Sequence, residues 1–143
     1  KRIQEWVEEA RDQGATIETG GERKGTMMYP TIITNVKKDM KVVKEEAFAP
    51  IVTVMPFKTE EEAVEKTNDS IFGLQAGVFT KDISRAYRVA DSLEMGGVWI
   101  NDSSVYRQDN YPYGGVKLSG LGREGVKYAM EEMTEMKFIG VRL

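Results

Sequence analysis

The sequence predicts an α/β fold in which βαβ units form a parallel sheet. Two observations predict it. Strand-like and helix-like segments alternate between residues 51 and 100, and both helical segments begin at good N-capping residues, Thr59 and Asp82. A composition of 41% hydrophobic and 30% charged residues in 143 residues fits a folded globular domain and argues against disorder. We therefore expect two successive βαβ units with right-handed crossovers.

The first part of the chain predicts one helix followed by irregular and extended segments. Residues 2–13 have helical spacing of their apolar side chains, and Gly14 suits the end of that helix. Residues 19–25 form a turn rich in glycine and charge. Residues 27–35 favour β structure but contain a proline, so we expect an edge strand or an irregular extended segment. Residues 39–46 predict a short extended connector.

The alternation of strands and helices begins after this connector. Residues 51–57 predict a buried strand, and a capping box of Thr59 and Glu62 opens a helix that ends near residue 68. A second strand is expected at 74–79 and a third at 97–100. Between them Asp82 caps a helix with one apolar face. That face consists of Ile83, Ala86, Tyr87, Ala90 and Leu93.

The regular pattern ends at the third strand. Residues 101–124 are rich in Gly, Asp, Asn, Ser and Tyr and have no clear periodicity, and a loop of this length in a compact domain is usually functional. It begins at the carboxyl end of a parallel strand, where open α/β sheets bind their ligands. We expect a helix at 126–133 and a strand in the tail, 134–143, anchored by Met136, Phe138 and Val141.

Composition excludes several kinds of chemistry for this chain. It has no Cys and no His, so a thiolate nucleophile, a Ser-His-Asp triad and a Cys- or His-ligated metal are excluded. A net charge of −3 disfavours nucleic-acid binding. No run of apolar residues is long enough for a membrane span.

We expect a cytoplasmic location. The sequence starts at Lys1 within a helical pattern, which suggests a cut in a longer protein.

Three short patterns have both a functional and an ordinary interpretation. Gly120–Gly125 matches G-x-G-x-x-G, but no strand precedes it and no acid follows about twenty residues later, so we interpret it as a tight turn into a helix. Arg107 lies among three tyrosines, which suits either a pocket for a small anion or a partner-facing loop. Methionines at positions 130, 133 and 136 predict core or interface packing.

Several ordered segments resemble motifs of the aldehyde dehydrogenase superfamily. Residues 45–51, E-E-A-F-A-P-I, resemble its E-E-x-F-G-P motif, and residues 68–80 resemble N-x-S-x-Y-G-L-x-A-x-V-F-T. The segment 97–101 resembles the G-x-V-x-x-N strand end. Residues 112–124 resemble P-F-G-G-x-K-x-S-G-x-G-R-E, and residues 21–31 resemble the G-G-to-P-T stretch. The motifs cover nearly the whole chain.

The resemblance implies the C-terminal part of an enzyme that oxidises an aldehyde to an acid with NAD or NADP. In that family the nucleophilic Cys, the general-base Glu and the oxyanion-site Asn precede the segment matched here, which agrees with the absence of Cys. We expect residues 1–133 to belong to the catalytic α/β domain and residues 134–143 to form an oligomerisation strand. This chain alone is expected to be inactive and to self-associate.

The resemblance also implies roles for individual residues. Glu46 would bind the hydroxyls of the nicotinamide ribose and Phe48 would back the nicotinamide ring. Glu124 would belong to a proton path in some members. The residues expected to line the substrate tunnel are Asn101, Tyr106, Arg107 and Tyr113.

Residues 101–111 resemble a branch that acts on small polar or anionic aldehydes, such as lactaldehyde, glyceraldehyde 3-phosphate or phosphonoacetaldehyde. Arg107 then has two open interpretations. It recognises a carboxylate, phosphonate or phosphate tail, or it orders the loop through a salt bridge. Two alternatives to the enzyme fragment also stay open. One is a stand-alone binding or oligomerisation module derived from such an enzyme, and the other is a small autonomous enzyme that uses carboxylates or lysine.

Overall fold

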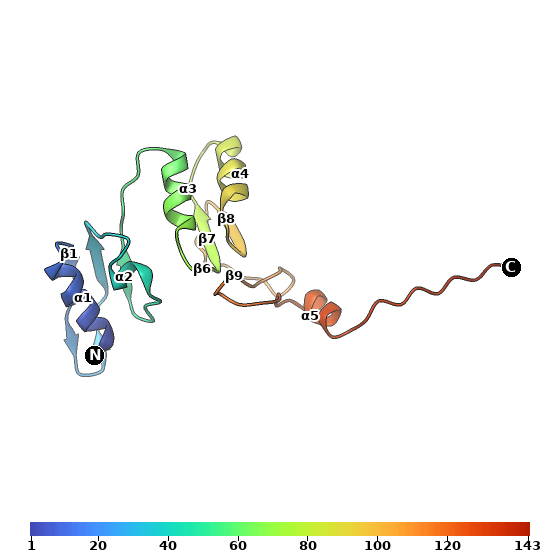
Figure 1. Ribbon diagram of the computed structural model, residues 1–143, viewed down its shortest axis with the longest axis horizontal. Helices are drawn as coiled ribbons and strands as arrows, with labels where there is room; N and C mark the ends of the chain where they lie inside the picture. Colours follow the sequence, from blue (N-terminus) through green and yellow to red (C-terminus); the bar gives the residue numbers. More distant parts are fainter. The chain divides into compact units, whose positions relative to one another are not determined.

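The computed structural model describes all 143 residues, which form two compact units, Lys1–Phe57 and Lys58–Leu143. Each unit combines helices with short strands (Figure 1). The predicted α/β class is therefore confirmed. None of the helices is long and apolar enough to cross a membrane.

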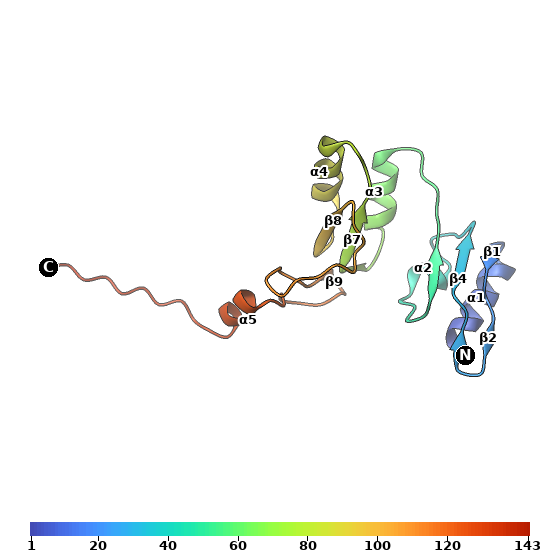
Figure 2. The same ribbon diagram turned by 180° about the vertical axis from the view of Figure 1, so that it is seen from behind.

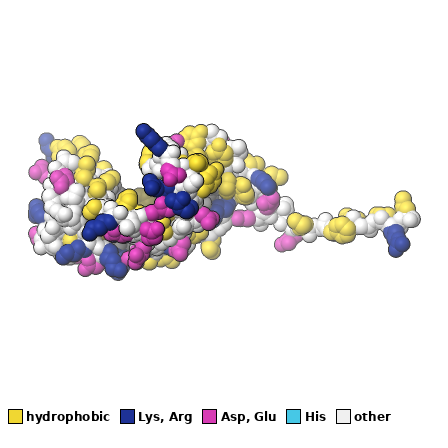
Figure 3. All heavy atoms as spheres, turned by 90° about the horizontal axis from the view of Figure 1, so that it is seen from above, with side chains coloured by type: hydrophobic (Ala, Val, Ile, Leu, Met, Phe, Trp, Pro, Cys, Tyr) yellow, Lys and Arg dark blue, Asp and Glu magenta, His cyan; other side chains and the backbone are white.

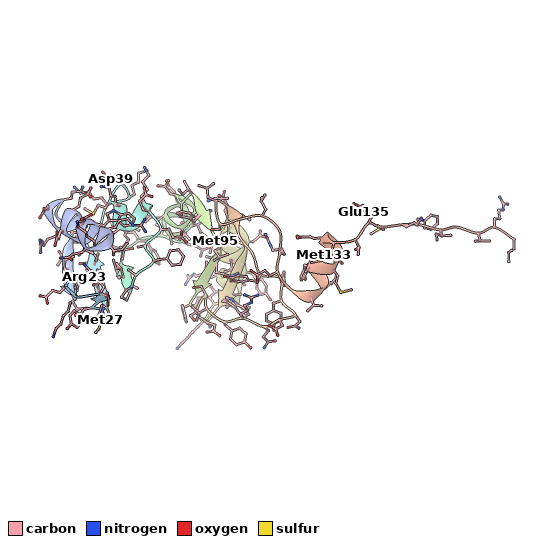
Figure 4. All side chains as sticks on the ribbon, turned by 90° about the horizontal axis from the view of Figure 1, so that it is seen from below. Arg23, Met27, Asp39, Met95, Met133 and Glu135 are labelled. Carbon is pink, nitrogen blue, oxygen red and sulfur yellow. The ribbon has the colours of Figure 1, made fainter.

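The first unit contains a three-stranded sheet in the order β1-β4-β5 and a small hairpin of β2 and β3. β1 and β4 are antiparallel, whereas β4 and β5 are parallel. Arg23 and Met27, labelled in Figure 4, lie on the two strands of the hairpin. The elements of this unit are α1 (Arg2–Asp12), β1 (Thr16–Thr19), β2 (Arg23–Lys24), β3 (Met27–Met28), β4 (Thr31–Thr34), α2 (Lys41–Lys44) and β5 (Ile51–Thr53).

A small apolar core holds the first unit together. α1 contributes Val7 and Ala10, which lie on one face because they are three residues apart. Ile33 of β4 is fully buried, and Met40 and Val42 complete the core. The predicted extended connector at 39–46 was therefore wrong. Burial of Met40 and Val42 favours the short helix α2, although valine by itself favours strands.

The second unit is built around β7 and β8, which are parallel along their full length from Gln75↔Gly97 to Val78↔Ile100. β6 and β9 form a separate antiparallel pair. Figures 1 and 2 both show α4 beside β7 and β8. The elements of this unit are α3 (Glu60–Asn68), β6 (Phe72–Gly73), β7 (Gln75–Val78), α4 (Ile83–Ser92), β8 (Gly97–Ile100), β9 (Val116–Lys117) and α5 (Val126–Glu132).

The structure forms one of the two expected βαβ units. β7, α4 and β8 make that unit, whereas β5 pairs with β4 and not with β7. β5 is also shorter than the predicted strand 51–57, and its buried character was wrong, because Val52 is 58% exposed. Only one edge of β5 is paired within this chain.

Both predicted helix caps are present. The Thr59 hydroxyl accepts a hydrogen bond from the Glu62 backbone N–H at 3.2 Å, and Asp82 Oδ1 accepts one from the Arg85 N–H at 3.1 Å. The Glu62 side chain closes the first cap by accepting from the Lys58 N–H at 2.7 Å. The Arg85 N–H bond lowers the pKa of Asp82, because it stabilises the ionised carboxylate.

Several apolar positions predicted to be packed are exposed in this chain. On α4 only Ala86 is buried, whereas Ile83 and Tyr87 are exposed. The three methionines at 130, 133 and 136 are also exposed, so their expected core role was wrong for this chain, and an interface role stays a prediction. Met133 is the C-cap of α5, and Glu135 follows in the tail (Figure 4). Residues 134–143 contain no helix or strand, so the expected tail strand is not formed within the chain.

The Asp82 cap predicts a specific acid sensitivity of α4. Because the pKa of Asp82 is lowered in the folded state, its stabilising contribution is complete above the ordinary value of 3.8 and is lost as the pH falls through the folded pKa. Asp82→Asn keeps a capping side chain but has no charge to titrate. We expect the difference in urea-unfolding stability between wild type and Asp82→Asn to shrink below pH 3.8.

Asp91→Asn is the matched control, since it removes a carboxylate from α4 away from the cap. A difference between wild type and Asp82→Asn that stays constant from pH 7 to about pH 2 would contradict the capping role.

Candidate functional site

The carboxyl ends of β7 and β8 are joined through Asn101. Asn101 has a positive φ of 58°, its N–H donates to the Val78 carbonyl at 2.8 Å, and its Oδ1 accepts from the Thr80 N–H at 2.8 Å. Asparagine tolerates this left-handed conformation better than most residues. These contacts fix the direction in which the long loop leaves the sheet. Asn101 also lines a cavity of about 530 Å³ with Phe79, Thr80, Lys81, Ile83, Ala86 and Ile100.

An aromatic cluster forms around Trp99 of β8. The ring of Tyr106 meets Trp99 edge-on, with centroids 4.9 Å apart and an interplanar angle of 79°. The ring of Tyr111 lies 5.8 Å from Trp99 and is tilted by 45°. Edge-to-face contacts of this kind suit the aromatic quadrupole. Residues 106 and 111 of the loop are therefore held against the strand.

Arg107 projects from this loop onto two partners. Its guanidinium carbon lies 4.4 Å from the centroid of the Tyr113 ring, which is a cation–π contact. Its Nη2 donates a hydrogen bond to Glu124 Oε2 and forms an ion pair with that carboxylate. Tyr113 and Glu124 are themselves paired through their backbones, with N–H···O distances of 3.1 and 2.6 Å. The two partners of Arg107 are thus locked side by side.

A cavity of about 190 Å³ lies between the aromatic cluster and Arg107. Arg107 is the only charged residue in its wall, so the cavity presents one positive group among aromatic and amide side chains. Such a lining suits a small molecule with an anionic end. The wall is formed by Gln75, Gly97, Val98, Trp99, Tyr106, Arg107, Tyr111, Pro112 and Tyr113.

Glycines let the segment after this cavity approach β8 closely. A Cβ on Gly96 would lie 1.7 Å from the Gly114 carbonyl oxygen, so only glycine fits there. Arg123 Nη1 then donates to the carbonyl oxygens of Gly115 and Gly122, both at 2.8 Å. The turn that follows has positive φ at its glycines and leads directly into α5. These glycines are Gly120, Gly122 and Gly125, so the interpretation of the G-x-G-x-x-G run as a tight turn is confirmed.

Glu46 and Phe48 lie in the first unit, on the loop between α2 and β5. Both residues are exposed, and Phe48 is 84% exposed. The loop is held by short-range bonds, such as Ala49 N–H to the Ala47 carbonyl at 2.8 Å. A free carboxylate two residues from an open aromatic face could bind sugar hydroxyls and cover a flat ring.

The structure brings together four of the seven predicted site residues: Tyr106, Arg107, Tyr113 and Glu124. Asn101 lines the larger cavity instead of this one. Trp99 and Gln75 were not predicted from the sequence. Trp99 lies in the strand-end motif 97–101, and an indole directly before a tyrosine-rich loop was a signal that could have identified it. No group of three or more acidic residues could hold a metal ion.

Comparison with known proteins decides the family. The model of the aldehyde dehydrogenase family matches residues 1–139. This chain belongs to the aldehyde dehydrogenase family. It is 51% identical, over its full length, to a 3-sulfolactaldehyde dehydrogenase of Priestia aryabhattai, and 47% identical over 138 residues (96% of the chain) to a lactaldehyde dehydrogenase of Methanococcus maripaludis. The chain spans about 30% of the length of each of these relatives.

Solved structures of the family have the same fold. Aldehyde dehydrogenase 21 of Physcomitrella patens, in complex with the reaction product succinate, matches 93% of this chain and 28% of its own, with a TM-score of 0.90 and 46% identity. A glyceraldehyde-3-phosphate dehydrogenase of Methanocaldococcus jannaschii, complexed with NADP, matches 95% of this chain and 29% of its own, with a TM-score of 0.88 and 47% identity. This aldehyde dehydrogenase chain thus corresponds to a part of such an enzyme.

The close contact at Gly96 predicts a strong effect of a single methyl group. Gly96→Ala should push the Gly114 carbonyl away from β8 and lower the free energy of unfolding by about 1–3 kcal/mol, as measured in urea. Gly140→Ala is the control, because its Cβ would meet only the exposed Phe138 ring. Equal stability of the two variants would show that the backbone contact at Gly96 does not exist.

Proposed function

We propose that this chain is the C-terminal part of an NAD- or NADP-dependent aldehyde dehydrogenase that oxidises a small anionic aldehyde to its carboxylic acid. The match to the family along residues 1–139 carries the proposal. The chain supplies neither the thiolate nor an imidazole, so nucleophilic attack on the aldehyde belongs to the remainder of the enzyme. Its own residues bind and orient the two reactants.

The exposed loop of Glu46 and Phe48 is the proposed cofactor contact. The ionised Glu46 carboxylate accepts hydrogen bonds from the two ribose hydroxyls, and the open face of Phe48 lies against the nicotinamide ring. The dinucleotide supplies a hydride acceptor when it is bound. The structure of the Methanocaldococcus jannaschii relative with NADP, and that of a Staphylococcus aureus betaine aldehyde dehydrogenase with NAD⁺, support a dinucleotide in the intact enzyme.

The cofactor role is tested with the neighbouring pair of glutamates. In the intact enzyme, Glu46→Gln should raise KM for NAD or NADP roughly ten- to hundredfold, because a charged hydrogen-bond acceptor is lost. Glu45→Gln removes the same charge one residue earlier and should leave this KM within about twofold of wild type. Similar KM values for the two variants would show that Glu46 does not bind the ribose hydroxyls.

The cavity of the second unit is the proposed binding place for the substrate tail. Arg107 is the only charge in its wall, and the rings of Tyr106 and Tyr113 shape the passage beside it. A guanidinium stacked on Tyr113 suits a planar carboxylate or a tetrahedral sulfonate or phosphate. The names of three relatives support an anion: one is a 3-sulfolactaldehyde dehydrogenase, one carries succinate as product and one is a glyceraldehyde-3-phosphate dehydrogenase. Lactaldehyde, named for another relative, is neutral.

The anionic tail is tested by comparing two aldehydes of similar size. In the intact enzyme, Arg107→Ala should raise KM for an anionic aldehyde roughly ten- to hundredfold and change KM for a neutral aldehyde much less. Arg85→Ala removes an arginine that pairs with Glu60 on the helices of the same unit, and it should change neither KM. Equal increases for both aldehydes after Arg107→Ala would leave Arg107 only the loop-ordering role.

Assembly of the enzyme is part of the proposal. The tail carries exposed apolar side chains at Met136, Phe138, Ile139 and Val141, visible as hydrophobic atoms along it in Figure 3. We infer that residues 1–133 belong to the catalytic domain and that residues 134–143 pair as a strand with another subunit of a homo-oligomer. The stand-alone module and a cytoplasmic location stay predictions.

A further inference from the structure

The ion pair of Arg107 with Glu124 raises a question about the proposed anion site. An arginine that binds a substrate anion is expected to offer its positive charge to the cavity. Here the Nη2 group already binds Glu124 Oε2, so the pair as a whole is neutral. Glu124 is not among the residues of the cavity wall.

We propose that Glu124 is an internal competitor for the anion site: its carboxylate occupies Arg107 until the anionic end of a substrate displaces it. The inference rests on the proposed function, since it deepens the role given there to Arg107. Glu124 thereby acts as a positioning residue and sets how strongly the cavity attracts anions.

The contacts around the pair favour such an exchange. Both side chains keep contact with water, at 46% exposure for Arg107 and 63% for Glu124, so the carboxylate can leave into solvent at little cost. The cation–π contact with Tyr113 does not involve the Glu124 carboxylate, and it keeps the guanidinium beside the cavity when the carboxylate leaves. The backbone pairing of Tyr113 and Glu124 holds the carboxylate within reach for its return.

Electrostatics give the direction of the effect. While Glu124 is bound, its negative charge offsets that of Arg107 and weakens the attraction between the cavity and any anion. Removing the Glu124 charge must therefore strengthen anion binding. A merely structural role predicts the opposite sign, because loss of the ion pair would disorder Arg107 and weaken anion binding.

The test measures binding of methanesulfonate, an unreactive monoanion, to this chain. Trp99 reports on the cavity wall once Trp6, which lies in the other unit, is replaced in a Trp6→Phe background. We expect Glu124→Gln to bind methanesulfonate about 1.5- to 5-fold more tightly than the parent, the range expected for an exposed ion pair. Arg107→Ala should abolish saturable binding in either background.

Glu131→Gln is the matched control, because it removes the same charge from α5 beside Lys127 and away from Arg107. Its methanesulfonate affinity should equal that of the parent. Affinity that is unchanged or weaker in Glu124→Gln, but still lost in Arg107→Ala, would overturn the competitor role and leave the anion site in place. Failure of every form to bind methanesulfonate saturably would overturn the anion site and the competitor role together.

Discussion

The backbone pair between Tyr113 and Glu124 is the constraint on which the candidate site depends. It joins the two ends of the ten-residue segment 114–123, which contains most of the tight glycine turn. It also places the Tyr113 ring beside the Glu124 carboxylate. Arg107 reaches both from a loop that is separately held by Trp99 through Tyr106. Without this backbone pair, the Tyr113 ring and the Glu124 carboxylate would not be held next to each other. Arg107, which contacts both, would then have no fixed position at the cavity.

A close approach between Gly96, directly before β8, and Gly114 also supports this arrangement. Gly96 begins the turn into β8, and its missing side chain leaves room for the Gly114 carbonyl. Arg123 then ties Gly115 to Gly122 through two hydrogen bonds from one nitrogen. These contacts explain why the segment needs glycine where a side chain would otherwise separate loop and strand. Of the three glycines that matched the dinucleotide fingerprint, Gly122 takes part in these contacts through its carbonyl oxygen.

The exposed apolar residues agree with the partial coverage of the family. Tyr87 and Ile83 on α4, the second edge of β5 and the methionines around α5 have no cover within this chain. Family relatives are about three times as long, so a large part of their structure has no counterpart in this sequence. Apolar surface of this extent is typical of faces that contact other protein segments.

The sequence by itself determined the features that depend on near neighbours. The caps at Thr59 and Asp82 and the glycine turn at 120–125 appear where they were predicted, because the deciding contacts lie within a few residues. The resemblance to aldehyde dehydrogenases was also readable, since it rests on motifs that do not require coordinates. It identified Arg107 and Glu124 separately, but not as partners.

Only the tertiary structure decided the features that depend on distant residues. Arg107 and Glu124 are 17 positions apart, so their ion pair follows from the backbone pairing and not from any local pattern. α2 formed where an extended connector was expected, because burial of Val42 outweighed its preference for strands. Asn101 lies apart from the other predicted substrate residues because of another contact between distant residues. Its side chain binds the Thr80 backbone at the end of the sheet, a contact that exists only once β7 and β8 are paired.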